Sequence, residues 1–379
     1  MSITNKTIIF GGSFDPVTTA HVDLIANLAR RFDKVIVTPC KLSPFKTKTG
    51  ASADERLDML NISLQNIERV EISTFELESD GVNYSYLTAE HFAKTYNKLY
   101  FAIGSEMIVE LEKWKELDRL TACATLYVIP RPSFPIGEGE LKKLEKLCSR
   151  FEIANFDGRE GSSSEVRISI AMNEPNTFLT PEVAKYVTEK GLYSEYNYVN
   201  ELYKRFNMKE KRIKHSFSTA LCGVKLAKRA CVATDKAITA LLLHDIGKYV
   251  TKEEAEQMGV KFGSRIDGMP LPIRHAEIGA EILSQLLGIK DEEIIEAVRW
   301  HTTGRPNMTP LEKVVYLADY IEPLRDFPTV DYLRKETEKS IDAGLLASLE
   351  NSVKYVSPDE IYPVTQEAYE YYLHNKENA

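Results

Sequence analysis

The chain has 379 residues, of which 43% are hydrophobic, 27% charged and 9% aromatic, and its formal net charge is −8. The length suggests two domains, and the composition is that of a globular protein, which excludes a disordered or fibrous chain. The negative charge argues against a nucleic-acid partner, because binding to a phosphate backbone needs a basic surface.

The sequence has no apolar run of about 18 residues or more, and its first residues lead directly into a predicted strand instead of a signal sequence. We therefore expect a cytoplasmic protein with no membrane partner, and its oligomeric state is left open. The five cysteines contain no C-x-x-C pair. They predict neither a disulfide framework nor a cysteine metal site, and small buried hydrophobic residues are their simplest role.

The first half of the chain alternates short β-branched or aromatic runs with amphipathic segments. Strands are predicted over residues 7–10, 34–39, 98–104 and 124–130, and a helix is predicted over residues 22–31. This alternation indicates an α/β domain in which helices wrap a parallel sheet. We expect it to cover residues 1–196.

The segment TIIFGGSFDPVTTAH, residues 7–21, predicts a strand, a glycine turn and a helix that begins near His21. Such a turn directs backbone N–H groups and a helix N-terminus at phosphate oxygens. The pair Gly11-Gly12 alone also fits an ordinary turn at the end of a strand. The segment is neither the G-x-G-x-x-G fingerprint nor a P-loop.

With its surroundings, this segment resembles the nucleotidylyltransferase superfamily, whose pattern G-x-F-D-P-x-[HT]-x-G-H is carried here by Gly12, Phe14, Asp15, Pro16, Thr18, Ala20 and His21. Over residues 1–196 the match is best to bacterial nicotinate mononucleotide adenylyltransferase. Among the matching segments are SPFK at 43–46, FELESDGVNYSYLT at 75–88, FAIGSEM at 101–107 and SSSEVR at 162–167. The resemblance implies a Rossmann-like domain in which the phosphate of nicotinate mononucleotide attacks the α-phosphate of ATP and pyrophosphate leaves, with Mg²⁺ accompanying ATP.

Adenylyl transfer needs positioning and charge neutralisation more than covalent catalysis. The resemblance assigns the α-phosphate contact to His21, next to Thr18, and the leaving phosphates to Lys46 and Arg167. Trp114 is expected to stack on the pyridine ring, although a half-buried core aromatic fits it equally well. The other expected nucleotide-binding residues are Gly11, Gly12, Ser13, Phe14, Ser85, Gly104, Arg131, Ser162, Ser163 and Ser164.

Three positions depart from the family pattern: Ala20 replaces a glycine, Glu106 replaces an aspartate, and Phe45 replaces a histidine before the motif lysine. They leave open a second interpretation, a degenerate nucleotide-binding module that regulates the other half. A third interpretation is phosphopantetheine adenylyl transfer, because FDPVTTAHVDLI resembles that family locally. The segments SYLT and GLY argue against it.

From about residue 200 the apolar spacing is helical throughout, as in AITALLLHDIGKYV, HAEIGAEILSQLLG and LEKVVYLADYI. Glycine and proline residues mark the turns between these segments. We expect an all-α domain over residues 197–379.

Four of the seven histidines of the chain lie between residues 215 and 301 of this half, and two aspartates share their apolar surroundings. A single histidine on such a face is more often an ordinary core residue. Together, however, the six form a ligand set suited to iron, manganese or a similar divalent ion. The expected ligands are His215, His244, Asp245, His275, His301 and Asp319.

Two metals that share one carboxylate clamp a phosphate and lower the pKa of a bound water to roughly 7, which makes hydroxide available at neutral pH. Asp245 is the expected bridging and catalytic carboxylate. Lys248 and Arg305 each lie four residues after a histidine, so both can present positive charge to a phosphate. Solvated surface cations are the alternative for these two residues.

The order H…HD…H…H…D resembles the HD superfamily, and the stretch WHTTGRPNMTPLEKVVYLADYIEPLR, residues 300–325, resembles bacterial HD-type symmetrical bis(5′-nucleosyl)-tetraphosphatases. The narrower resemblance implies hydrolysis of diadenosine tetraphosphate to two ADP at a two-metal centre, usually iron. The general HD pattern leaves cyclic-nucleotide phosphodiesterase and nucleotide-alarmone hydrolase open. The expected partners of the whole chain are small nucleotides: ATP, nicotinate mononucleotide and diadenosine tetraphosphate.

Overall fold

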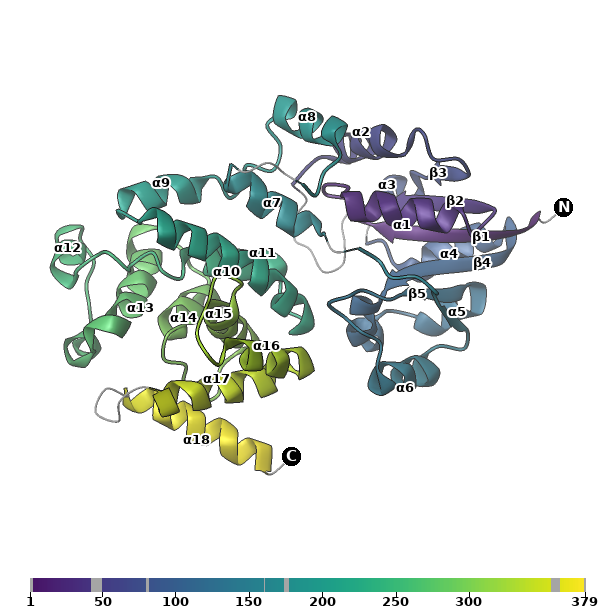
Figure 1. Ribbon diagram of the computed structural model, residues 1–379. Helices are drawn as coiled ribbons and strands as arrows, with labels where there is room; N and C mark the ends of the chain where they lie inside the picture. The colour runs from purple at the N-terminus through teal and green to yellow at the C-terminus, as the bar shows by residue number, and fades with distance from the viewer. Residues whose placement is uncertain are drawn as a thin grey trace. The chain divides into compact units, whose positions relative to one another are not determined.

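The computed structural model describes residues 3–41, 50–79, 82–159, 161–173, 177–355 and 362–377. The chain divides into two compact units, Met1–Glu195 and Tyr196–Ala379, and each is described by itself (Figure 1). Within the described residues, no helix carries a stretch long and apolar enough to cross a membrane.

The first unit is an α/β domain, as the sequence predicts. Its elements are β1 (Ile3–Gly12), α1 (Thr19–Ala29), β2 (Lys34–Pro39), α2 (Ala53–Leu64), β3 (Val70–Ile72), α3 (Phe75–Glu78), α4 (Ser85–Ala93), β4 (Tyr96–Gly104), the 3-10 segment η1 (Ser105–Lys113), α5 (Leu117–Cys123), β5 (Thr125–Ile129), α6 (Glu138–Leu147), β6 (Phe151–Ile153), α7 (Ser163–Ala171) and α8 (Pro181–Lys190).

The six strands form one parallel sheet in the order β3-β2-β1-β4-β5-β6. The chain therefore reverses its direction of winding between β1 and β4, and in such sheets ligands bind where the carboxyl ends of these two strands separate. The sequence did not predict β3 and β6. Each is a three-residue strand at an edge of the sheet, too short to show an alternating pattern.

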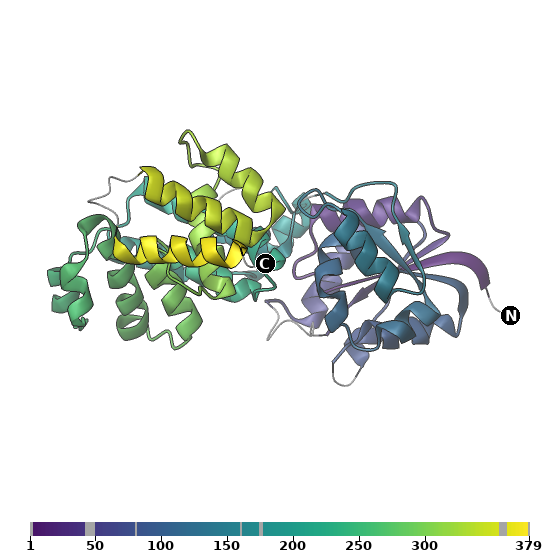
Figure 2. The ribbon, with the colours of Figure 1, turned by 90° about the horizontal axis from the view of Figure 1, so that it is seen from below.

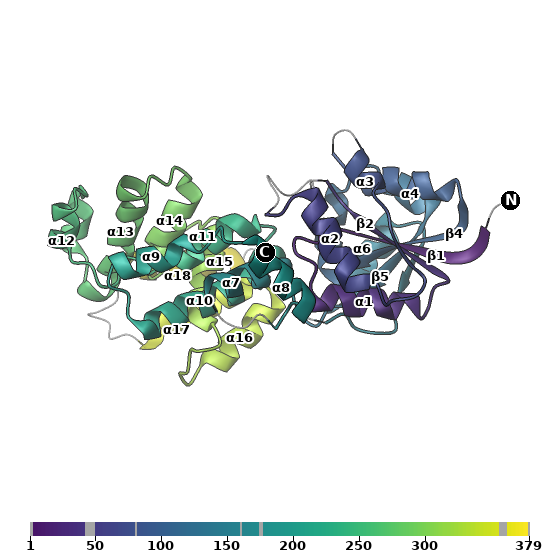
Figure 3. The same cartoon turned by 90° about the horizontal axis from the view of Figure 1, so that it is seen from above.

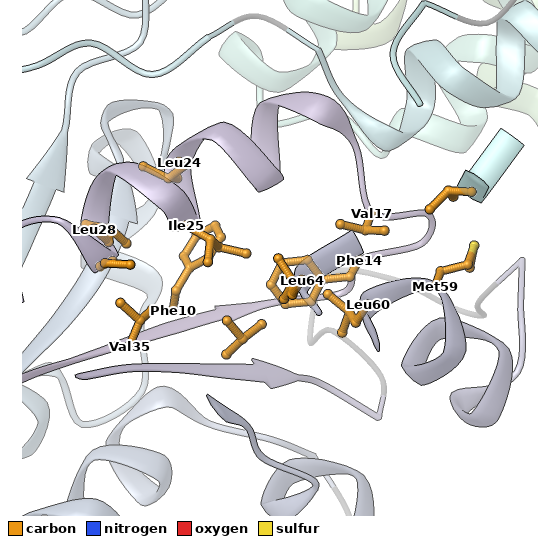
Figure 4. Close-up of a cluster of buried hydrophobic side chains, with 14 of the residues drawn as sticks. Phe10, Phe14, Val17, Leu24, Ile25, Leu28, Val35, Met59, Leu60 and Leu64 are labelled. Atoms are coloured by element: carbon orange, nitrogen blue, oxygen red, sulfur yellow. The ribbon is translucent and has the colours of Figure 1, made fainter. Parts of the chain in front are cut away.

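Alternate side chains of β1 point into two separate cores, one on each face of the sheet. Ile8 and Phe10 pack with α1, α2, α7 and α8, whereas Ile9 packs with α4, η1, α5 and α6. This follows from the two-residue period of a strand. Figures 1 and 3 show the strands between the two helical layers, and Figure 4 shows Phe10 and Val35 under Leu24, Ile25 and Leu28 of α1.

The second unit is all-helical, as predicted. Its elements are α9 (Tyr198–Arg205), α10 (Glu210–Arg229), α11 (Thr234–Leu243), α12 (Lys252–Gln257), the 3-10 turn η2 (Ser264–Gly268), α13 (Leu271–Glu281), the π-helical turn η3 (Ile282–Leu286), α14 (Glu292–Trp300), α15 (Pro310–Ile321), α16 (Val330–Lys339), α17 (Ile341–Tyr355) and α18 (Pro363–Glu377).

The core of the second unit lies between α10, α11, α14 and α15, which pack against one another. Leu241, Leu242 and Leu243 of α11 are fully buried there, and so are five apolar residues of α15: Val314, Val315, Tyr316, Leu317 and Ala318. The last two helices, α17 and α18, lie side by side (Figures 1 and 2). Helices that meet in one core bring the polar residues at their ends and along their inner faces close together.

Candidate active sites

A cavity of about 370 Å³ opens in the first unit where the strand order reverses, at the carboxyl ends of β1 and β4. This is the place where doubly wound sheets bind their ligands. The expected residues that line it are Gly11, Gly12, Ser13, His21, Ser85, Gly104, Trp114 and Arg131. The indole nitrogen of Trp114 is buried and has no hydrogen-bond partner among the described residues.

Thr18 and His21 form a reciprocal cap at the start of α1. The Thr18 hydroxyl accepts from the backbone N–H of His21, and His21 Nδ1 accepts from the backbone N–H of Thr18 at 3.0 Å. Because Nδ1 is an acceptor, the proton of the neutral ring lies on Nε2, where it can be donated to a ligand. The cap also explains why α1 begins at Thr19, before the expected position near His21.

Buried polar residues fix the turn that follows β1. The guanidinium of Arg56, which is almost fully buried, donates at 2.7 Å to the carbonyls of both Ser13 and Cys40. The fully buried Asp15 carboxylate accepts from the N–H groups of Gly50 and Ala51 and from the Tyr193 hydroxyl. These bonds hold the turn after β1 against the rest of the unit, so the backbone of Gly12 and Ser13 is rigid where it faces the cavity.

The N-terminus of α7 lies against this turn but outside the cavity. Ser162 caps the helix, Ser163 donates to the carbonyl of Pro16 at 2.9 Å, and Thr18 donates to the carbonyl of Gly161 at 3.4 Å. The structure thus brings together the two motifs expected to surround ATP. Within the described residues, Ser162, Ser163, Ser164 and Arg167 are not among those that line the cavity, and neither is Phe14, which is buried in the core.

Arg167 does not present its charge as expected. It is buried and its guanidinium lies 3.4 Å from the carboxylate of Glu195. Lys46 and Phe45 lie outside the described residues.

The departures from the family pattern have visible structural effects. The Glu106 carboxylate folds over Gly104, where a methyl group would collide with it, and it lies 3.6 Å from Arg131 Nε. Ala20 is buried, and its methyl group lies 3.5 Å from where a Cβ of Gly161 would be. Ala20 therefore fills the contact between α1 and the loop before α7, and it is not among the residues that line the cavity.

Glu76 is a cavity residue that sequence reasoning missed. Its buried carboxylate accepts from the hydroxyls of Thr88 at 2.7 Å and Thr38 at 3.3 Å, both at the same oxygen. Burial raises the pKa of Glu76, while the two hydroxyls oppose this shift. The only sequence signal was its place in the segment FELESDGVNYSYLT.

The second site lies where α10, α11, α13, α14 and α15 meet. His215 lies within α10, His275 within α13 and Asp319 within α15, whereas His244 and His301 are the C-cap residues that directly follow α11 and α14. The HD pair is therefore in a turn and not inside a helix. Gly247 lets this turn approach α13, because a Cβ there would lie 2.6 Å from the backbone nitrogen of Gly279.

All six expected ligands converge on one cluster, in two groups that share Asp245. Its Oδ2 lies 3.8 Å from His215 Nε2 and 3.4 Å from His244 Nε2, and its Oδ1 lies 3.1 Å from His275 Nε2 and 3.7 Å from His301 Nε2. Asp319 Oδ1 completes the first group, at 2.8 Å from His215 Nε2 and 3.7 Å from His244 Nε2. Donor atoms this close fit divalent metal ions.

In three of the histidines, the contact of Nδ1 determines which ring nitrogen carries the proton. Nδ1 of His244 lies 2.6 Å from the carbonyl of Leu241, Nδ1 of His301 lies 2.7 Å from that of Val298, and Nδ1 of His215 lies 3.0 Å from the buried Glu322 carboxylate. Each Nδ1 must therefore carry the proton, which leaves Nε2 free to ligate a metal.

The charge states of two residues of the cluster also favour a metal, whereas the pKa of His215, although burial opposes this shift, is raised by its hydrogen bonds to Asp319 and Glu322. Burial lowers the pKa of His275 to about 4, so its ring is neutral near neutral pH. Although burial opposes it, the surrounding histidines hold the pKa of Asp245 well below its usual value. Neutral imidazoles and ionised carboxylates are the forms that bind metal ions.

Three cations border this cluster within a cavity of about 510 Å³. Arg212 donates to Asp245 at 2.6 Å, Arg325 donates to Asp319, and Lys248 Nζ lies 3.3 Å from His275 Nδ1. Burial lowers the pKa of Lys248. Of the two expected cations, Lys248 lines the cavity.

Arg305 differs from the expectation. Its guanidinium binds both oxygens of Glu312, at 2.9 and 2.8 Å, and it is not among the residues that line the cavity. Glu312 is 1% exposed. A carboxylate buried to this degree needs a paired cation. Arg305 therefore neutralises Glu312 and does not face a phosphate in the cavity.

Comparison with known proteins matches residues 9–169 to the cytidylyltransferase-like family and residues 212–324 to the HD domain family. A probable nicotinate-nucleotide adenylyltransferase of Campylobacter fetus is 34% identical over 187 residues, 48% of this chain and 97% of the relative. The symmetrical bis(5′-nucleosyl)-tetraphosphatase of Bacillus subtilis is 38% identical over 150 residues, 39% of this chain and 80% of the relative.

The chain belongs to both families, one in each half. A Mycoplasma genitalium protein named a probable nicotinate-nucleotide adenylyltransferase/Ap4A hydrolase has the same arrangement, with 27% identity over 329 residues that cover 84% of this chain and 88% of the relative. The adenylyltransferase half thus holds the cavity at the strand reversal, and the tetraphosphatase half holds the histidine–aspartate cluster.

Sequence reasoning missed three charged residues of the tetraphosphatase half: Arg212, Glu322 and Arg325. A signal was present for Arg212, which lies three residues before His215 and so on the same face of α10. Glu322 and Arg325 follow α15, where helical spacing no longer indicates direction.

Proposed function

We propose that the chain is a bifunctional enzyme that transfers the adenylyl group of ATP to nicotinate mononucleotide and hydrolyses diadenosine tetraphosphate to two ADP. The observation that carries the second activity is the sharing of Asp245 between two ligand groups, an arrangement that suits a pair of metals. The first activity is supported by a cavity at the strand reversal that His21 lines, and by the cap of α1, which places the proton of the neutral His21 ring on Nε2.

In the tetraphosphatase half, His215, His244 and Asp319 would hold one metal, His275 and His301 the other, and Asp245 both. Iron or manganese suits this mixture of imidazole and carboxylate ligands. When bound, the metals supply Lewis acidity that lowers the pKa of water.

The role we assign to Arg212, Arg325 and Lys248 is to bind the phosphate chain. They border the cluster from within the same cavity, so they can neutralise oxygens of the phosphate that reacts and of the ADP that leaves. Arg212 and Arg325 are the stronger candidates, because a guanidinium can bind two phosphate oxygens at once.

In the adenylyltransferase half, His21 Nε2 would donate a hydrogen bond to the α-phosphate as negative charge develops on it. An oxygen of the nicotinate mononucleotide phosphate forms the new bond to the α-phosphorus, and the bond from that phosphorus to the bridging oxygen breaks, so that Mg²⁺-bound pyrophosphate leaves. The rigid turn at Gly12 and Ser13 supplies backbone N–H groups, and the N-terminus of α7 adds a positive helix end beside it.

A crossed pair of variants in the full-length protein tests both assignments. Asp245→Ala should abolish formation of ADP from diadenosine tetraphosphate and leave pyrophosphate release from ATP and nicotinate mononucleotide unchanged. His21→Ala should do the reverse, with ATP affinity only modestly changed. Asp331→Ala and His91→Ala replace exposed residues of the same types and serve as controls.

The outcomes separate the candidate functions. Hydrolysis that survives Asp245→Ala would refute the metal assignment, and release of AMP and ATP would refute the cleavage position. ATP binding without any transfer would favour the regulatory nucleotide-binding module, for which the Glu106 carboxylate folded over Gly104 is the structural argument.

A further inference from the structure

The cavity of the tetraphosphatase half has two chemically different sides. One side carries the metal-ligand cluster and the three cations described above. The other side is an apolar wall made of Pro272, Ile273, Tyr320, Phe327 and Pro328, with the polar side chains of Thr329 and Asn351 at its edge. The proposed hydrolysis uses only the first side.

Part of the apolar wall is built on the same helices as the proposed metal ligands, and Phe327 and Pro328 lie in the segment between α15 and α16. Tyr320 directly follows Asp319 in α15, and Ile273 lies two residues before His275 in α13. Phe327 packs edge-on against Tyr320, with ring centroids 5.7 Å apart. The wall is therefore held at a fixed distance from the site of hydrolysis.

Hydrogen bonds hold the polar edge of the wall in place. Asn351 donates to the Tyr320 hydroxyl at 2.9 Å and accepts from the Thr329 hydroxyl at 2.7 Å. The two hydroxyl groups and the side-chain amide thus form one fixed polar strip beside the aromatic rings.

Exposed apolar side chains lie next to the wall in sequence. Leu271 is 76% exposed and Leu324 is 61% exposed, the two highest values among the large hydrophobic side chains of the described residues. Leu271 precedes Pro272 of the wall, and Leu324 precedes the cavity residue Arg325. Neither side chain lines the cavity itself, and single exposed apolar residues are common on protein surfaces, so the nucleoside site rests on the wall alone.

We propose that the apolar wall binds one nucleoside of the substrate. This inference rests on the proposed hydrolysis of a dinucleoside polyphosphate. A base has two apolar faces that stack on aromatic rings, and a ribose has hydroxyl groups that the strip of Thr329 and Asn351 can bind. The phosphates that continue from the ribose then reach the cations and the metal ligands within the same cavity.

The wall also selects the bond that is cleaved. Because Tyr320 and Asp319 are neighbours on one rigid helix, a nucleoside bound to the wall limits which phosphorus can reach the ligand cluster. A substrate that is not anchored by its base can slide along the cluster.

The test uses the full-length, metal-loaded protein and measures the inhibition of diadenosine tetraphosphate hydrolysis by ADP and by inorganic pyrophosphate. Inhibition constants report on the hydrolytic site alone, so binding of ADP to the adenylyltransferase half does not interfere. We expect Phe327→Ala to weaken inhibition by ADP about tenfold, the scale of one lost base–aromatic contact, and to leave inhibition by pyrophosphate unchanged.

Matched variants separate a lost contact from a damaged fold. Phe327→Tyr keeps the ring and should be inhibited by ADP as strongly as the unchanged protein. Phe327→Leu keeps the apolar volume without the ring and should be inhibited as weakly as Phe327→Ala. Tyr332→Ala removes an exposed ring that is not part of the wall and should leave ADP inhibition unchanged. The proportion of AMP and ATP among the products should rise only in the variants that lose the ring.

Each result is decisive. Equal ADP inhibition in Phe327→Ala and the unchanged protein would overturn the nucleoside site while the proposed hydrolysis stands. A parallel loss of inhibition by ADP and pyrophosphate would also overturn it, because it would show damage to the phosphate side. Absence of hydrolysis in the unchanged protein would overturn the proposed function, and the nucleoside site with it.

Discussion

Replacing Glu322 with glutamine tests how the histidine cluster is held. Glu322 is 1% exposed, and its carboxylate is fully used: Oε1 lies 3.0 Å from His215 Nδ1, and Oε2 accepts from Ser218 Oγ at 2.5 Å and from Leu324 N at 2.6 Å. The variant keeps the volume of the side chain and turns one of its acceptor oxygens into a donor.

Either orientation of the new amide has a cost. With its NH₂ group towards Leu324, a partly exposed backbone N–H loses its partner, and the free energy of unfolding should fall by about 1 kcal/mol. With its NH₂ group towards His215, the ring must move its proton to Nε2, and the affinity for metal should fall about 10- to 100-fold.

Two measurements on the full-length protein decide the outcome: urea unfolding of the metal-free form and titration with Mn²⁺. Glu338→Gln, which changes an exposed glutamate of the same half, is the control. If Glu322→Gln leaves both the free energy of unfolding and the Mn²⁺ affinity at the control values, the inference that Glu322 fixes the proton of His215 is wrong.

Two further predictions concern other buried positions. Gly247→Ala places a methyl group 2.6 Å from the backbone nitrogen of Gly279, so the free energy of unfolding should fall by about 1–3 kcal/mol and Mn²⁺ binding should weaken, whereas Gly268→Ala, which meets no atom within 4 Å, should change neither. Glu76→Gln should stabilise the protein in a pH-dependent way, because burial raises the pKa of Glu76 in the folded state. The native protein is therefore favoured at low pH, where Glu76 is protonated, and this stability is lost as the pH rises through the folded pKa, whereas glutamine stays neutral at every pH. The difference in unfolding free energy between the variant and the native protein should therefore grow from about pH 4 towards neutrality, and a constant difference would contradict the role of burial.

The fold class of both halves could be predicted because the spacing of apolar residues differs so strongly between them. Strand β2 coincides with the predicted residues 34–39, since its short continuous run of β-branched residues leaves little ambiguity. The ends of helices were harder. His244 and His301 lie just beyond α11 and α14, and the apolar spacing before them does not show where the last helical hydrogen bond is made.

The residues of the histidine–aspartate cluster and their order were visible in the sequence, whereas their charged neighbours were not. The position of Arg305 predicted a phosphate contact, but the buried Glu312 competes for the same guanidinium. Arg56 was unremarkable as part of a helix pattern, yet its guanidinium supports the turn after β1 from 43 residues away. Such pairings depend on which buried group lacks a partner, and that is known only once the chain is folded.

The guanidinium groups of Arg212 and Arg325 have a consequence for the apoprotein. Many small metal-binding domains unfold when a chelator removes their ion, because the ligand charges then repel one another or remain buried without a partner. Here Asp245 and Asp319 already have cationic partners within the protein. A chelator should therefore stop hydrolysis while circular dichroism stays unchanged, and activity should return when the ion is restored, so that the tetraphosphatase half can exchange its metal without having to refold.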